Sequence, residues 1–223
     1  MDSSKLAAAQ AALRMVKPGM SIGLGTGSTA EIFIRLLGER NRRERLGLRC
    51  IATSAASERQ AKRLELRLAG FDSIRRPDIA FDGADRVDRR LNLIKGLGGA
   101  LVREKIVDYR AGRFVVMVGE SKLAPSLSGT VPVEVIPIAE AAVKRDLVAL
   151  GAKSFETRMD GRRKFVSDNS NLILHADFGR IADPAGLERR INEIAGVVDN
   201  GLFTRKRPVV IAGREGGSTR ILR

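Results

Sequence analysis

Short apolar segments alternate with amphipathic ones along the first half of the chain, and this alternation restricts the fold more than any other feature. Strands are expected at 20–23, 49–52, 78–81 and 114–118, and helices at 5–16, 30–43, 55–68 and 100–109. Strands separated by helices are typical of a parallel sheet with helices on both faces. We therefore predict an α/β fold with a mostly parallel sheet flanked by helices.

The pattern changes after a stretch containing proline, serine and glycine at 123–130, which we interpret as a linker. Beyond it the sequence predicts a strand at 131–136, a helix at 139–150, a hairpin of 154–159 with 164–167, a strand at 172–177, a helix at 185–194 and a strand at 197–198. These turn signals indicate a smaller α+β insert of about seventy residues. We expect 208–212 to return to the main sheet, which gives domains at 1–126, 127–203 and 204–223.

Composition excludes several classes of protein. The 223 residues include one cysteine, Cys50, so no internal disulfide forms, and one histidine, His175, which disfavours a Ser-His-Asp triad or a histidine metal site. We expect Cys50 and His175 to have structural roles. We find neither an apolar stretch of membrane-spanning length nor a signal peptide, and expect a cytoplasmic protein without a membrane partner.

The charge leaves two kinds of partner open. Forty Lys and Arg residues against 26 Asp and Glu give a net charge of +14, which suits nucleic acid or small anionic substrates equally well. The basic residues are spread along the chain, Trp is absent and Tyr109 is the one tyrosine. Because aromatic stacking platforms are missing, we disfavour specific nucleic-acid binding.

The first candidate site is the glycine turn Gly25-Thr26-Gly27-Ser28-Thr29, between a predicted strand and a predicted helix. Backbone N–H groups at such a turn, together with the helix N-terminus, favour phosphate. Ser28 and Thr29 are suited to cap the helix and to donate hydroxyl hydrogen bonds. A tight turn with an ordinary cap would explain the same residues.

Acidic residues follow another predicted strand, in Asp82-Gly83-Ala84-Asp85. Two carboxylates three residues apart at a strand end can point into one crevice, where burial and repulsion perturb their protonation. A surface turn would explain them equally simply. Asp88 is flanked by arginines and is expected to be solvated.

Two further loops carry charged residues. Lys95-Gly96-Leu97-Gly98-Gly99 leads into a helix with Glu104 near its start, and Lys122 follows the strand at 114–118. Helix-dipole complementarity would explain Glu104, but a general base facing the same crevice would as well. All four loops follow predicted parallel strands, and together they carry phosphate-binding groups, paired carboxylates, lysines and one glutamate. This combination indicates acid–base chemistry on a small phosphorylated metabolite, without a metal ion.

Taken together, these segments resemble the type A ribose-5-phosphate isomerases over nearly the whole chain. The motifs that carry the resemblance are Gly25–Thr29, Asp82–Asp85, Lys95–Lys105, Glu120–Leu123, Pro132–Pro137, Asp168–Asn171 and Gly196–Phe203. The resemblance implies a Rossmann-like domain with an inserted α+β domain. It also implies isomerisation of ribose 5-phosphate and ribulose 5-phosphate in the non-oxidative pentose phosphate pathway, with no cofactor or metal and with a homodimer or homotetramer as the assembly.

The resemblance also implies roles for individual residues. Glu104 would move a proton between C1 and C2 through a cis-enediolate, Asp82 and Asp85 would assist ring opening, and Lys95 would stabilise the oxyanion. The expected substrate-binding residues are Thr26, Gly27, Ser28, Thr29, Gly83, Ala84, Gly96, Leu97, Gly98, Lys122 and Lys5.

Three positions depart from the family pattern: Leu97 and Ser170 stand where glycine is usual, and Arg86 stands beside Asp85 where an acidic residue is usual. Three rival functions remain: a non-catalytic phosphosugar sensor, a related deaminase or CoA transferase, and nucleic-acid binding. No helix-turn-helix segment precedes the predicted sheet, and a deaminase would be expected to use a pair of histidines. The isomerase is therefore the preferred interpretation.

Overall fold

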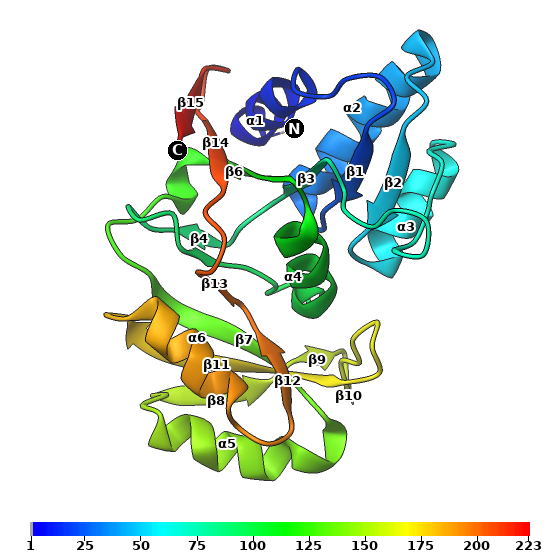
Figure 1. The fold of residues 1–223 in the computed structure, drawn as a ribbon. Helices are drawn as coiled ribbons and strands as arrows, with labels where there is room; N and C mark the ends of the chain where they lie inside the picture. The colour runs from blue at the N-terminus through cyan, green and yellow to red at the C-terminus, as the bar shows by residue number, and fades with distance from the viewer. Residues whose placement is uncertain (1) are drawn as a thin grey trace. The chain divides into compact units, whose positions relative to one another are not determined.

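Six strands form the central sheet of the computed structural model, which describes residues 2–223 (Figure 1). In spatial order they are β15 (Thr219–Leu222), β14 (Val209–Gly213), β6 (Arg113–Gly119), β3 (Ile79–Asp82), β1 (Ser21–Leu24) and β2 (Arg49–Ala52). All neighbours pair in parallel except β15, which pairs antiparallel with β14 at one edge. The predicted α/β class and the return of the C-terminal segment to this sheet are confirmed.

The two faces of the sheet are built differently. Ile22 and Phe81 point into a core formed with α1 (Ser3–Leu13) and α2 (Ser28–Glu44). Ala80 lies on the other face, against Val107 of α4 (Leu101–Arg110). A Cβ atom on Gly23 would lie 2.6 Å from Cγ1 of Val107, so α4 packs this closely only because position 23 has no side chain.

Helix α1 begins beside the carboxyl ends of two strands. Asp2 caps it, since its Oδ1 accepts hydrogen bonds from the backbone N–H groups of Ser4 and Lys5. A Cβ atom on Gly213, the last residue of β14, would lie 1.8 Å from the carbonyl oxygen of Ser4. Glycine at the strand end therefore admits the first turn of α1.

The chain forms two units. Unit 1 holds the six-stranded sheet and consists of the described residues up to Ala84 together with Arg103–Leu123 and Lys206–Arg223. Unit 2 consists of Asp85–Val102 and Ala124–Arg205.

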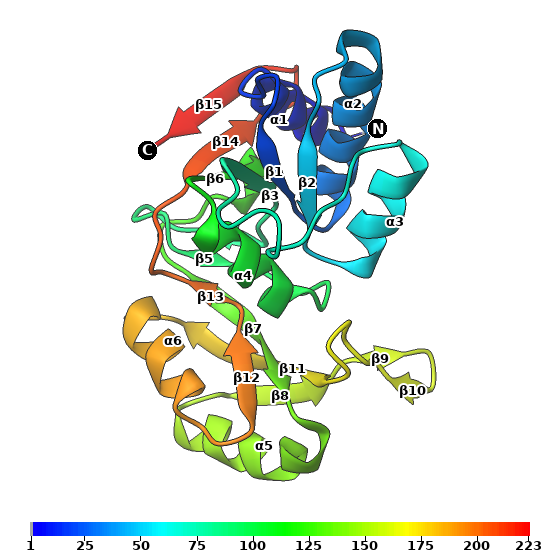
Figure 2. The ribbon, with the colours of Figure 1, turned by 45° about the vertical axis from the view of Figure 1, so that its right-hand side comes forward.

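Unit 2 is built around an antiparallel sheet with the strand order β12 (Val197–Asn200), β7 (Ser128–Val135), β11 (Leu172–Arg180) and β8 (Ser154–Thr157). Helices α5 (Glu140–Ala149) and α6 (Pro184–Asn192) lie beside this sheet (Figure 2), and their buried side chains share one core with its strands. The expected α+β insert is confirmed as a class, whereas the boundaries at 127 and 203 stay a prediction.

Three very short strands in unit 2 were not predicted. They are β13 (Leu202–Phe203), β5 (Leu93–Ile94) and β4 (Arg86–Val87), which form a small antiparallel sheet in that order. Each has two residues, which is too few for the alternation of apolar and polar residues that marks a strand in sequence.

Two predicted elements are corrected. The helix expected at 55–68 ends as α3 at Arg63, because the following chain turns back to the sheet, where Leu68 bridges Cys50. The predicted hairpin of 154–159 with 164–167 forms only beside its turn at Asp160-Gly161, where β9 (Met159–Asp160) pairs with β10 (Arg163–Lys164) and Met159 lies opposite Lys164. The remainder of the predicted first strand, β8, pairs with β11 instead.

Across residues 2–223, no helix combines the length and apolar character needed to cross a membrane.

Candidate active site

Asp82 is fixed by the glycine turn on the neighbouring strand. It ends β3 and is fully buried, and its Oδ1 accepts hydrogen bonds from the backbone N–H groups of Thr26 (2.9 Å) and Gly83 (2.7 Å). A Cβ atom on Gly25 would lie 2.2 Å from that oxygen. The turn and the carboxylate, which are 56 residues apart in sequence, therefore form one structural feature.

The start of α2 lacks the expected side-chain cap. Gly27 is the N-cap residue, with φ +100°, and the helix start has no side-chain cap hydrogen bond. Ser28 and Thr29 are instead the first helical residues, so the prediction that they cap the helix is wrong. The first-turn N–H groups are not used by a capping side chain, which suits an anion such as phosphate.

The Thr26 hydroxyl is already engaged within unit 1. Its Oγ1 lies 2.7 Å from Oγ1 of Thr53 and 2.8 Å from Oγ of Ser54. Ser54 also forms a capping box with Ser57 at the start of α3 (Ala55–Arg63). Thr53 and Ser54 were missed by sequence reasoning, although their position directly before a helix is a recognisable cap signal.

Glu104 lies in the first turn of α4 and is 3% exposed. Lys122, at the end of the 3-10 turn η1 (Glu120–Lys122) after β6, is exposed. Lys5 is half-buried in the first turn of α1, with its Nζ 3.4 Å from Asp2. Because α1 begins beside the ends of β6 and β14, unit 1 carries both lysines near the carboxyl edge of its sheet.

In unit 2, Asp85 forms hydrogen bonds with the backbone on both sides of Lys95. The Asp85 N–H donates to the carbonyl of Ile94 (2.8 Å), and its Oδ2 accepts from the backbone N–H of Leu97 (3.2 Å). Lys95 is 2% exposed. The loop residue Leu97 is half-buried, Gly98 is exposed, and Ala84 is half-buried at the end of the preceding segment of unit 1.

Leu97 is accommodated because the loop takes its left-handed backbone conformations elsewhere. Gly96 and Gly99 each have φ +86°, whereas Leu97 does not have a positive φ. A side chain at 97 therefore brings no backbone strain.

Sequence reasoning missed the pair that packs on Gly99. The guanidinium of Arg158 stacks 3.8 Å above the ring of Phe165, and a Cβ atom on Gly99 would lie 2.4 Å from Nη1 of Arg158. Burial lowers the pKa of Arg158. Nothing in the local sequence connects the hairpin at 158–165 to the loop at 96–99.

Asp88 is buried rather than solvated, so that expectation is wrong. Its Oδ1 accepts hydrogen bonds from the N–H groups of Arg90 and Asn92, both 2.8 Å, and closes the turn between β4 and β5. The flanking arginines were misleading because backbone donors, not arginine side chains, satisfy this oxygen.

The single histidine and cysteine lie in packed surroundings. Burial lowers the pKa of His175, with further lowering by Arg158 and an opposing effect of Glu156. Burial raises the pKa of the Cys50 thiol to about 12, which makes it a poor nucleophile. Within residues 2–223, no group of three His, Cys, Asp or Glu side chains is placed to hold a metal ion.

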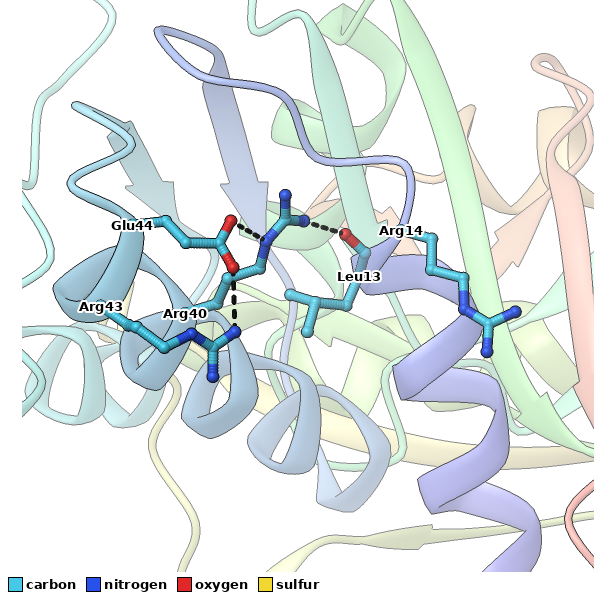
Figure 3. Close-up of a pocket in the computed structure, with 5 residues that line it drawn as sticks. All are labelled: Leu13, Arg14, Arg40, Arg43 and Glu44. Carbon is cyan, nitrogen blue, oxygen red and sulfur yellow. Dashed lines mark hydrogen bonds and ion pairs between the residues drawn. The ribbon is translucent and has the colours of Figure 1, made fainter.

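Unit 1 also has a surface hollow of about 410 Å³, which is lined by residues other than those predicted for the site. Figure 3 shows Arg40 reaching the carbonyl oxygen of Leu13 (2.8 Å) and the carboxylate of Glu44 (2.8 Å), which Arg43 also contacts. These two arginines are occupied by partners of their own helix or of α1, and none of the predicted site residues lines this hollow.

Comparison with known proteins shows the family of this chain. A family model described as ribose 5-phosphate isomerase A (phosphoriboisomerase A) matches residues 49–217. Ribose-5-phosphate isomerase A of Methanocaldococcus jannaschii is 46% identical over 222 residues, which cover 98% of this chain and 97% of that protein. Its counterpart from Pyrococcus horikoshii is 43% identical, covering 97% of this chain and 96% of that protein.

Solved structures agree as well. A ribose 5-phosphate isomerase A structure from M. jannaschii aligns with a TM-score of 0.92 at 45% identity, covering 98% of this chain and 97% of that one. A D-ribose-5-phosphate isomerase in complex with phospho-erythronic acid aligns with a TM-score of 0.93 at 41% identity, covering 98% and 96%.

The Rossmann-like fold, together with these relatives, places the chain among the α/β aldose–ketose isomerases. The chain belongs to the ribose 5-phosphate isomerase A family.

Proposed function

We propose that this chain interconverts D-ribose 5-phosphate and D-ribulose 5-phosphate, as in the non-oxidative pentose phosphate pathway, without a metal or organic cofactor. The observation that carries the proposal is the near-full-length similarity to ribose-5-phosphate isomerases A at 41–46% identity. Side chains suited to acid–base chemistry occupy the positions that the family resemblance assigns to catalysis.

Glu104 is the proposed base. Its carboxylate removes the proton from C2 of the open-chain aldose, and the electron pair moves through C1 onto the aldehyde oxygen, which gives a cis-enediolate. The proton of the C2 hydroxyl passes to the C1 oxygen, which moves the negative charge to the C2 oxygen. The protonated Glu104 then returns its proton to C1 as the electron pair on the C2 oxygen forms the ketone. Burial of Glu104 supports this role, because a base shielded from water keeps the abstracted proton for return.

Three further residues assist this transfer. We assign oxyanion stabilisation to Lys95, whose burial strengthens its interaction with a developing negative charge. Asp82 and Asp85 assist ring opening and hold sugar hydroxyls. Backbone hydrogen bonds fix one oxygen of each, which keeps their orientation constant through the reaction.

The phosphate is assigned to the N-terminus of α2. Ser28, Thr29 and the first-turn N–H groups supply donors, and Lys5 and Lys122 supply positive charge. Thr26, Gly27, Gly83, Ala84, Gly96, Leu97 and Gly98 are proposed to line the remainder of the substrate.

The relative solved with phospho-erythronic acid supports a phosphorylated sugar as the ligand. The carboxylate of such an acid is planar and carries two oxygens on one carbon, which resembles the planar, oxygen-rich C1–C2 unit of an enediolate. A site that favours this geometry stabilises the transition state more than the substrate.

The test is conversion of ribose 5-phosphate in the presence of EDTA by the wild type and by Glu104→Gln. Loss of a general base is expected to lower kcat by about 10²-fold or more. Glu58→Gln is the matched control, because Glu58 lies in the first turn of α3 and is exposed. The proposal is abandoned if the folded wild type binds the sugar phosphate without turning it over, or if Glu104→Gln retains full kcat.

We also propose that the chain acts in the cytoplasm as a homodimer or homotetramer, without specific nucleic-acid or membrane partners. Exposed apolar side chains, including Ile138 at 94% exposure, support self-association. Light scattering after size-exclusion chromatography gives the assembly directly, and a monomeric mass at all concentrations would remove this part.

A further inference from the structure

The ring of Phe203 lies beneath the ammonium group of Lys95. The distance from Nζ to the ring centroid is 5.3 Å, and both residues are buried, Phe203 completely and Lys95 with 2% of its surface exposed. A cation within about 6 Å of a ring centroid is attracted to the negative face of the ring, most strongly where water is excluded. Phe203 thus contacts a proposed catalytic lysine, although the proposed mechanism gives Phe203 no role.

The backbone holds this pair in register. The N–H of Lys95 donates to the carbonyl of Gly201 (2.9 Å), and the N–H of Gly201 donates to the carbonyl of Pro132 in β7 (2.7 Å). A Cβ atom on Gly201 would lie 2.3 Å from the carbonyl oxygen of Lys95 and 2.6 Å from Pro132. The absence of a side chain at 201 therefore lets the segment of Phe203 approach Lys95.

Further contacts hold the same segment. Strand β13 pairs with β5, with Leu202 opposite Ile94 and Phe203 opposite Leu93. Asn200 Oδ1 accepts a hydrogen bond from the N–H of Leu202 (3.0 Å), and Thr204 bonds through its N–H and hydroxyl to Glu188 of α6. Phe203 consequently has little freedom to move away from Lys95.

We propose that Phe203 is a positioning residue for Lys95: its ring face holds the buried ammonium group in place and keeps it protonated for the oxyanion. This inference rests on the proposed role of Lys95 in isomerisation. A buried lysine has lost much of its hydration, and the ring supplies an electrostatic replacement that adds no competing acceptor for the ammonium N–H groups.

A purely apolar role for Phe203 makes different predictions. If Phe203 only fills space in the core, Phe203→Leu lowers the stability of the protein through lost packing but leaves the protonation of Lys95 unchanged. A ring that stabilises the ammonium form acts through Lys95 alone, and its loss changes kcat and the alkaline limb of the pH profile.

The experiment measures kcat, KM and the pH dependence of kcat/KM for Phe203→Leu and Phe203→Tyr. We expect Phe203→Leu to lower kcat about 3- to 30-fold and to move the alkaline limb about half a unit to one unit toward lower pH. KM should change less than kcat. Phe203→Tyr keeps an aromatic ring at this position and should therefore retain most of the wild-type kcat. Phe155→Leu is the matched control, because Phe155 faces Lys144 at 5.6 Å but is 39% exposed.

If Phe203→Leu does not fold, progressively fluorinated phenylalanine at 203 replaces it, because fluorine weakens the negative ring face while keeping its shape. The proposal then expects kcat to fall with each added fluorine. A constant kcat and an unmoved alkaline limb across the series overturn it.

A double-substitution cycle separates this inference from the proposed function. If Phe203 acts through Lys95, Phe203→Leu should cause no further loss in a Lys95→Met background. An equal loss in both backgrounds overturns the positioning role. Full activity of Lys95→Met alone would instead refute the assigned role of Lys95, whereas an inactive Lys95→Met with fully active Phe203 variants would refute this inference alone.

Discussion

Ser170 illustrates how a single residue carries a backbone constraint of this fold. Its φ of +64° lies in the left-handed region, where glycine is favoured. The surrounding turn is fixed, because Ser167, Asn169 and Asn171 all donate side-chain hydrogen bonds to Oε1 of the buried Glu134, at 2.9 to 3.0 Å. The turn therefore imposes this conformation whatever residue stands at 170.

We predict that Ser170→Gly raises the free energy of unfolding by about 0.5–1 kcal/mol, because relief of the left-handed strain exceeds the added chain entropy of glycine. Urea denaturation monitored by circular dichroism measures the change. Ser73→Gly is the control, since Ser73 lies in an exposed turn without a positive φ and should gain nothing. A loss of stability in Ser170→Gly would show that the turn does not impose strain.

At the scale of elements, the start of α5 is tied to two strands through one carboxylate. Glu140 accepts hydrogen bonds from Lys144 (2.7 Å), from Thr157 of β8 (2.6 Å) and from Lys164 of β10. Its side chain is 13% exposed. The hydrogen bond from Lys144, followed by those from Lys164 and Thr157, lowers the pKa of Glu140 from 4.5 to about 2.

This shift predicts acid sensitivity of unit 2. Because the folded state lowers the pKa, the contribution to stability is complete above about pH 4.5 and disappears as the pH falls toward about 2. After allowance for solvent screening, we expect it to be worth about 1 kcal/mol. Urea denaturation at pH 5 and pH 2.5 should show a smaller acid-induced loss in Glu140→Gln than in the wild type. Glu39→Gln, in an exposed pair with Arg35, should behave like the wild type, and identical losses in all three would contradict the assignment.

At the scale of the whole molecule, the net charge of +14 bears on substrate capture. A sugar phosphate carries up to about two negative charges at pH 7. A strongly positive protein attracts such an anion over distances near the Debye length, which is about 10 Å at 0.1 M salt.

We predict that kcat/KM for ribose 5-phosphate falls severalfold between about 0.02 and 0.3 M NaCl while kcat changes little, because screening weakens encounter but not chemistry. Sucrose at matched osmolality serves as the control for non-ionic effects. A salt-independent kcat/KM would leave the charge without a role in steering.

Much of the fold was predictable because its signals are local. The strands at 49–52 and 114–118 are apolar runs between helical patterns, and β2 has the predicted bounds while β6 extends the prediction at both ends. The end of α3 was not predictable, because the sheet pulls Leu68 out of a continuing helical pattern. Strand β13 was not predictable either, because its two residues form a strand only through their pairing with Ile94 and Leu93.

For the site, the sequence by itself singled out the residues that we propose carry chemistry: the glycine turn, the aspartates at 82 and 85, Lys95 and Glu104 stand out by residue type and by the resemblance to the family. Only the tertiary structure decided their surroundings. It joined Asp82 to the turn at 25–26, placed Phe203 beneath Lys95 and buried Asp88. The physical reason is that residue type and spacing act over a few neighbours. Burial and the partners of a charged group depend instead on segments far apart in the sequence, such as those of Lys95 and Phe203, which only packing brings into contact.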